Sequence, residues 1–126
     1  MPTAQYIPGT CNIGPKEIRL RRIAGWIGLI STLLLGALFI YLHVLPWVRI
    51  VLFIPATISA LGFLQAAFHF CAAFGMKGLF NVSSEVGKTE SVSQQEFLNA
   101  DKRKALVIIS YAVWIGLVVA FGAVYV

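Results

Sequence analysis

The sequence predicts an all-α integral membrane protein with three transmembrane helices, its N-terminus inside and its C-terminus outside. Composition is the first observation behind this prediction: the 126 residues are 59% hydrophobic and 12% charged, whereas soluble domains are about 45–50% apolar. The second is that three stretches free of charged side chains are long enough to cross a bilayer, which takes about 20 helical residues. We therefore expect one membrane domain over residues 1–126, with no separate soluble catalytic domain.

The first two spans are predicted to form a hairpin. Residues 1–22 make a polar and basic cytoplasmic segment, and Pro15 suits the first turn of a helix that continues into span one, residues 23–45. Pro46 then breaks the helix, and span two covers residues 50–76. The connection is so short that the two spans must run antiparallel.

The remaining elements follow from a proline, a polar stretch and a capping pattern. Span two is longer than a bilayer needs, so we expect it to tilt, or to bend near Pro55. Residues 77–104 form a cytoplasmic loop, irregular over 79–89. Ser-Gln-Gln-Glu at 93–96 matches a capping box and predicts a helix that starts near Gln94 and continues into span three, residues 105–126.

The positive charges predict the orientation. Nine of the ten Lys and Arg residues precede span one or lie between spans two and three, and Arg49 alone lies on the other side. The positive-inside rule then places the N-terminus and the long loop in the cytoplasm, as in a multi-pass inner-membrane protein. Because these basic residues lie at the boundaries of the lipid bilayer, we expect no nucleic-acid partner.

Small residues at helical spacing predict the packing faces. Helices in a bilayer associate where small side chains let their backbones approach. The predicted packing residues are Gly28, Thr32 and Gly36 in span one, Gly62 and Ala66 in span two, and Ala112, Gly116 and Ala120 in span three. These residues either only pack the three helices on one another or also dock another subunit, since three helices leave aromatic faces uncovered.

Two histidines are the candidate cofactor-binding residues. His43 and His69 are the only histidines of the chain, and their predicted depths differ by about 20 Å, which excludes both from ligating one haem within one protomer. Either could still be a lone axial ligand of a haem or a chlorin. The alternative is that each hydrogen-bonds a neighbour, which for His69 would be Gln65 one turn earlier.

Two cysteines are the candidate metal ligands. Cys11 and Cys71 are both expected near the cytoplasmic face. They fall short of the four ligands of a usual structural zinc site, and a reducing cytoplasm disfavours a disulfide between them. A buried cysteine that acts as a small hydrophobic residue is the alternative.

The chain lacks the signals of common enzymes and transporters. It contains no HExxH, GxSxG, P-loop or GxGxxG pattern, and its five acidic residues all lie in polar segments. No carboxylate or basic side chain is expected at mid-depth, where a proton pump or ion-coupled transporter needs one. We therefore predict no catalytic residue.

Parts of the chain resemble a set of small uncharacterised three-helix bacterial membrane proteins. The resemblance rests on Cys-Asn-Ile-Gly-Pro at 11–15, the basic run at 19–22, and the stretch from Leu52 to Gly78, and it covers most of residues 11–81. The set has no assigned activity. What it implies is that Cys11, Gln65 and Cys71 belong to a common pattern on the cytoplasmic side. His69 stands where such relatives carry a basic residue, so a shared charged function does not follow.

These observations predict a non-enzymatic accessory or scaffolding subunit of a larger membrane complex, of the energy-converting kind. A homo-oligomer satisfies the same packing argument. One alternative is a small haem- or pigment-binding redox or antenna protein that uses a lone membrane histidine. A second alternative is a thiol or metal site at the cytoplasmic face.

Overall fold

The structure is a computed structural model that describes residues 6–82 and 89–125. Three helical stretches in it are long and apolar enough to span a membrane. They are α1 (Pro15–Tyr41), the 3₁₀ helix η1 (Pro46–Leu52) continued by α2 (Phe53–Phe68), and α4 (Gln95–Val124). The prediction of a mostly helical chain with three such helices is therefore confirmed.

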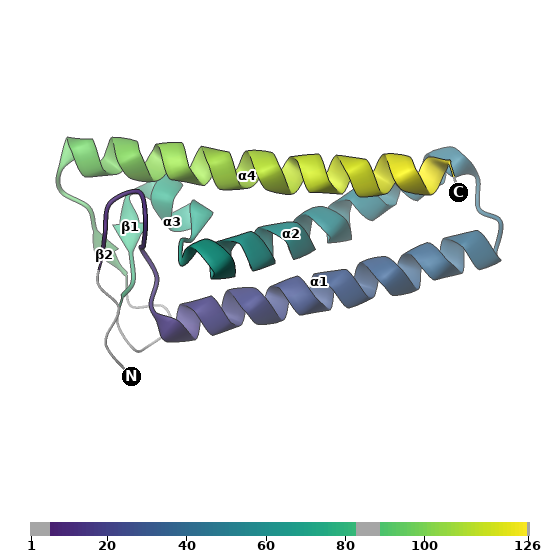
Figure 1. Ribbon diagram of the computed structural model, residues 1–126, viewed down its shortest axis with the longest axis horizontal. Helices are drawn as coiled ribbons and strands as arrows, with labels where there is room; N and C mark the ends of the chain where they lie inside the picture. Colours follow the sequence, from purple (N-terminus) through teal and green to yellow (C-terminus); the bar gives the residue numbers. More distant parts are fainter. Residues whose placement is uncertain (1–5, 83–88, 126) are drawn as a thin grey trace.

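The long helices form a layer with α2 in the middle (Figure 1). α2 packs against α1 on one side and α4 on the other, whereas α1 and α4 make almost no contact with each other. α1 and α4 run in the same direction and α2 runs in the opposite one (Figure 1). The layer is thus an open arrangement and not a closed three-helix bundle.

Span two is not the single helix over residues 50–76 that the hydropathy predicts. α2 ends at Phe68, His69 adopts the left-handed conformation with φ 55°, and a short helix α3 (Ala72–Lys77) follows. The carbonyl of Gln65 accepts the backbone N–H groups of both His69 and Phe70, a pattern that closes a helix. Side chains of Asn12 and Gln65 then form hydrogen bonds with the backbone groups of Cys71 and Ala72. The break in the helix therefore does not leave these backbone groups unpaired.

The other helix limits follow local signals. α1 starts at Pro15 as predicted, but it ends at Tyr41 and so stops short of residue 45. α4 starts at Gln95, which confirms the predicted start near Gln94. The capping box itself is wrong, because Gln94 is the N-cap and no side chain caps the helix. The end of span three at Val126 lies outside the described residues.

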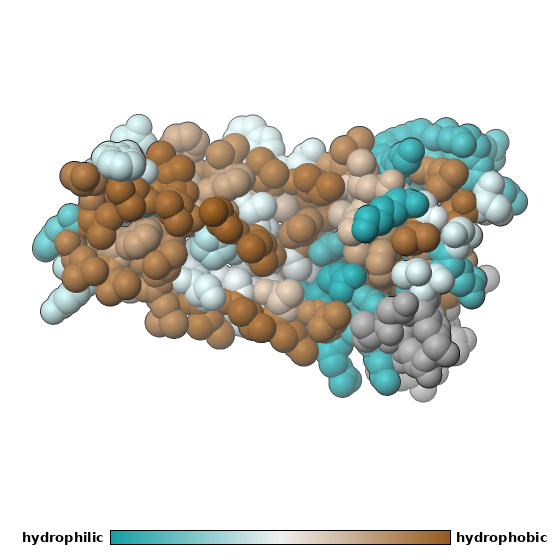
Figure 2. Space-filling model, turned by 180° about the vertical axis from the view of Figure 1, so that it is seen from behind, coloured by the Kyte–Doolittle hydropathy of each residue, from teal (hydrophilic) through white to brown (hydrophobic). Residues whose placement is uncertain are grey.

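One end of the layer is polar, and we call it the polar end. Four segments meet there: the start of α1, the break after α2, the short helix α3 and the start of α4. Two antiparallel strands of two residues each, β1 (Leu79–Phe80) and β2 (Glu90–Ser91), lie at the same end. The predicted loop thus contains a hairpin, whereas its residues 83–88 lie outside the described part. On the face shown in Figure 2, hydrophilic residues gather mainly at this end, and apolar residues predominate along the rest of the helices.

Candidate functional site

A group of polar side chains, all buried except the half-buried Arg21, lies at the polar end. We call it the polar cluster and define it as Asn12, Glu17, Arg21, Gln65, Cys71 and Asn81. These residues come from the N-terminal segment, the first turns of α1, the end of α2, the break before α3 and the residue after β1. Segments far apart in the sequence therefore converge at one place.

Asn12 is the centre of this cluster. Its side chain is fully buried, its Oδ1 accepts the N–H of Cys71 at 2.6 Å, and its Nδ2 donates to the Cys71 carbonyl at 3.1 Å. Its backbone N–H donates to the His69 carbonyl, and its own carbonyl accepts the N–H of Asn81. One amide thus joins the N-terminal segment to the break after α2, in place of the backbone partners that a continuous helix would supply.

A charged pair continues the cluster into α1. Glu17 and Arg21, one helical turn apart, form an ion pair at 3.0 Å in which the Glu17 carboxylate is almost completely buried. The second oxygen of Glu17 accepts the Asn81 side-chain amide at 3.3 Å, and Arg21 Nη2 lies 3.2 Å from the Cys71 sulfur. A buried charge needs partners of this kind to offset its desolvation.

A second polar contact fixes the N-terminal segment to α4. Asp101 is fully buried; its Oδ2 accepts the Tyr6 hydroxyl at 2.6 Å and its Oδ1 accepts the Gly9 N–H at 2.7 Å. The Tyr6 ring stacks on Phe80 with 4.3 Å between centroids. Burial and the nearby Asp101 carboxylate raise the pKa of Tyr6 well above its ordinary value.

The two cysteines are placed differently. Cys71 is buried, Cys11 is half-buried, and both are free thiols. The Cys11 thiol donates to the Ile13 carbonyl at 3.6 Å, and burial raises the pKa of Cys11. Within residues 6–82 and 89–125, no group of three or more His, Cys, Asp and Glu side chains is arranged to hold a metal ion. A thiol or metal site stays a prediction.

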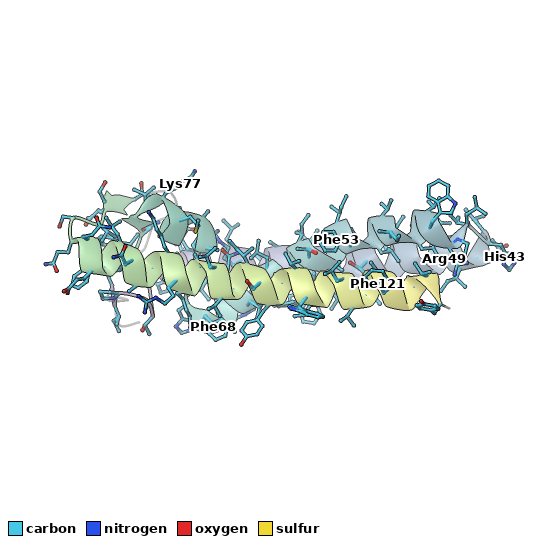
Figure 3. The ribbon with its side chains drawn as sticks, turned by 90° about the horizontal axis from the view of Figure 1, so that it is seen from above. His43, Arg49, Phe53, Phe68, Lys77 and Phe121 are labelled. Atoms are coloured by element: carbon cyan, nitrogen blue, oxygen red, sulfur yellow. The ribbon has the colours of Figure 1, made fainter. Side chains whose placement is uncertain are left out.

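The two histidines lie at or just beyond helix ends: His69 is the C-cap of α2, and His43 follows Leu42, the C-cap of α1. Both have positive φ, 53° at His43 and 55° at His69, and both side chains are exposed. Figure 3 shows His43 at the opposite end of the molecule from Lys77. The predicted contact of His69 with the Gln65 side chain is wrong, because Gln65 Oε1 accepts the N–H of Ala72 at 2.8 Å. The left-handed turn at His69 directs its side chain elsewhere.

The predicted packing residues lie mostly between α2 and its neighbours. A Cβ on Gly28 would meet the Ser59 backbone at 2.8 Å, and one on Gly62 would meet the Gly25 backbone at 2.6 Å. A Cβ on Gly116 would lie close to the Phe53 ring of α2, whereas one on Gly36 would make only an ordinary contact with Leu52. The alanines of the set are buried: Ala66, Ala112 and Ala120.

An apolar groove runs between α1 and α4, and we call it the α1–α4 groove. Its volume is about 480 Å³, and its lining residues are Leu29, Thr32, Ala56, Ser59, Ala60, Phe63, Leu64, Ala67, Ile115 and Val119. Both hydroxyls in it are already bonded, Thr32 to the Gly28 carbonyl and Ser59 to the Gly25 carbonyl. The groove therefore presents carbon atoms and no free polar atom of these two side chains.

Sequence reasoning missed several of these residues. Arg49 was expected only as the one basic residue on the opposite side of the membrane from the other nine. It is buried and donates to the carbonyls of Val44 and Ala123, near the end of α4 (Figure 3). Asn12 lies within the motif that carries the resemblance, but nothing local shows that its side chain turns inward. Glu17 and Arg21 did carry a signal, because an acid and a base one turn apart can pair.

Comparison with known proteins adds no relative: no family model, curated protein or solved structure matches the chain. The resemblance to small bacterial membrane proteins stays a prediction. The site must therefore be interpreted from its own geometry. The polar cluster ties the N-terminal segment to the helices through its own hydrogen bonds, whereas the α1–α4 groove lies among apolar side chains of the three long helices.

Proposed function

We propose that this chain is a non-enzymatic accessory or scaffolding subunit, and that the α1–α4 groove receives one transmembrane helix of a larger membrane complex. The observation that carries the proposal is the open layer, in which α1 and α4 leave one face of α2 uncovered. An energy-converting host stays a prediction, because the geometry of the groove says nothing of the partner's chemistry.

The floor of the groove favours a helix as its occupant. Four of the six α2 residues that line the groove are small, namely Ala56, Ser59, Ala60 and Ala67, and the other two are Phe63 and Leu64. Small residues let a second helix backbone approach closely. A flexible acyl chain does not need such a floor. The two walls also lie far enough apart that α1 and α4 make almost no contact.

The exposed side chains are consistent with this proposal. Large apolar residues face outward on all three long helices, among them Trp26 at 54% exposure, Ile54 at 58% and Trp114 at 67%. Such a surface suits lipid tails and helices of another subunit alike. The proposal therefore rests on the hollow shape of the groove and not on surface hydrophobicity.

Site-directed photo-crosslinking tests the proposed partner. A benzoylphenylalanine at Ala67, an exposed residue of the groove, should crosslink to one membrane protein in native membranes. The matched control is the same probe at Leu34, which is 68% exposed and is not a groove residue. Crosslinks to lipid alone at both positions would contradict the proposal, and a crosslinked dimer of this chain at Ala67 would show a homo-oligomer instead.

The orientation is part of the same proposal. The basic residues and the polar end would face the cytoplasm of an inner membrane, with the end of α4 outside, following the positive-inside rule. An alkaline phosphatase fused after residue 126 should then be active, and a fluorescent protein fused there should be dark. The reverse pattern would contradict this orientation.

A further inference from the structure

A second, smaller pocket lies beside two basic residues of α4, the exposed Arg103 and the half-buried Lys104. Its volume is about 270 Å³, and its lining residues are Gly9, Ala100, Arg103, Lys104 and Val107. This volume is several times the roughly 30 Å³ that one water molecule occupies in the liquid, so a larger ligand fits. From these residues we propose that the pocket binds the phosphate headgroup of an anionic phospholipid. The proposal does not depend on the partner of the α1–α4 groove.

The walls of the pocket are held in place by other contacts. Gly9 has φ 69°, and its N–H donates to buried Asp101 at 2.7 Å, which fixes the N-terminal turn against α4. The Lys104 ammonium lies 4.3 Å from the centre of the Phe68 ring, a cation–π contact that restrains this flexible side chain. Phe68 and Lys77 point to opposite faces of the layer, so Lys104 leans toward the Phe68 face (Figure 3).

The two cations are available to an anion. Among the described residues, neither Arg103 nor Lys104 forms an ion pair with a carboxylate within 4.0 Å. Asp101, the nearest acid along α4, already accepts hydrogen bonds on both of its oxygens. A guanidinium and an ammonium side by side can each donate to phosphate oxygens.

The position of the pocket favours a lipid over a soluble phosphate. Arg103 and Lys104 are the last charges before a charge-free stretch that begins at Ala105, so they lie at the headgroup depth of a bilayer. From the pocket, exposed apolar side chains continue along one face of α4 at intervals of three or four residues: Val107, Tyr111, Trp114 and Val118. This stripe offers an acyl chain a path directly below the headgroup.

Native mass spectrometry in mild detergent tests the proposal with phosphatidylglycerol as the probe. The wild-type chain should retain one phosphatidylglycerol, and the double variant R103Q/K104Q should bind it about 25-fold more weakly, because each cation near an anionic lipid contributes about fivefold. The matched control K16Q/R19Q removes two exposed cations from α1 at the same end and should bind as the wild type does. All mutated residues are solvent-exposed or half-buried, and circular dichroism checks that each variant keeps its helices.

Three results would overturn the proposal. If both double variants lose the lipid equally, the attraction belongs to the overall surface charge and not to the pocket. If inorganic phosphate at matched ionic strength displaces the lipid, or binds where phosphatidylglycerol does not, the pocket is a site for soluble phosphate. Retention of phosphatidylcholine as tightly as phosphatidylglycerol would likewise contradict recognition of an anionic lipid.

Discussion

Asn12 is the residue on which the polar end depends most directly, because one buried amide replaces two backbone partners of Cys71. We expect Asn12→Ala to lower the free energy of unfolding by about 2–4 kcal/mol, since it removes two hydrogen bonds and leaves buried backbone groups unpaired. Chemical denaturation in detergent measures this change. Asn99→Ala is the matched control, because Asn99 is an exposed amide whose Oδ1 accepts a hydrogen bond from the exposed Gln95 side chain. Equal effects of the two substitutions would contradict the role given to Asn12.

Tyr6 gives a pH-dependent signature at the same scale. Its pKa is raised from the ordinary 10.0 by burial and by Asp101, so the folded state favours the protonated phenol. The stabilisation is then present below pH 10 and is lost as the pH rises through the folded pKa. The difference in phenolate absorbance between wild type and Tyr6→Phe should show Tyr6 less than half ionised at pH 10. Half ionisation of Tyr6 at or below pH 10 would contradict the hydrogen bond from its hydroxyl to the Asp101 carboxylate.

At the scale of elements, glycines set the distance between α1 and α2. A Cβ at Gly28 would meet backbone atoms of Ser59 at 2.8 Å, so one of the helices would have to move. We expect Gly28→Ala to destabilise the fold by about 1–3 kcal/mol, as overpacking does in a tight interior. Gly122→Ala is the control, because nothing lies within 4 Å of its Cβ position. Thermal unfolding in detergent compares the two, and an unchanged midpoint for Gly28→Ala would contradict the close approach.

The break between α2 and α3 gives a second prediction for an element. His69 has φ 55°, a conformation that costs a non-glycine residue about 1–2 kcal/mol. We expect His69→Gly to keep the fold and to raise the thermal midpoint, because glycine adopts this conformation freely. If His69 were an axial ligand, the same substitution would instead abolish a visible absorption band of the purified chain.

The sequence predicts those features that local signals determine. Pro15 and the Ser-Gln-Gln-Glu pattern at 93–96 indicate where two helices start, although no side chain caps the second helix, and hydropathy indicates the three apolar helices. The break at His69 could not be predicted in this way, because Asn12, 59 residues from Cys71, supplies the hydrogen bonds that replace the helical ones. Local hydropathy contains no information about such a distant partner.

In the candidate site, too, some features follow from local sequence signals and others depend on residues that are distant in the sequence. Of Cys11, Gln65 and Cys71, which the resemblance places in one pattern, Gln65 and Cys71 belong to the polar cluster and Cys11 does not. Asn12, Glu17 and Asn81 join the cluster only through the path of the folded chain. The groove also depends on the packing of the whole molecule. Small residues predict close helix contacts, but they do not predict that α2 lies between α1 and α4 and leaves one face open.

For the whole molecule, the most direct test is purification of tagged chain from native membranes in mild detergent. We predict that wild type co-purifies with one stoichiometric membrane protein and shows no visible absorption of its own. Ala67→Trp, which fills the α1–α4 groove from an exposed position, should lose that protein, and Leu34→Trp, on an exposed position outside the groove, should keep it. A chain that runs alone with a visible band, lost on His43→Ala or His69→Ala, would contradict the account and show a cofactor protein instead.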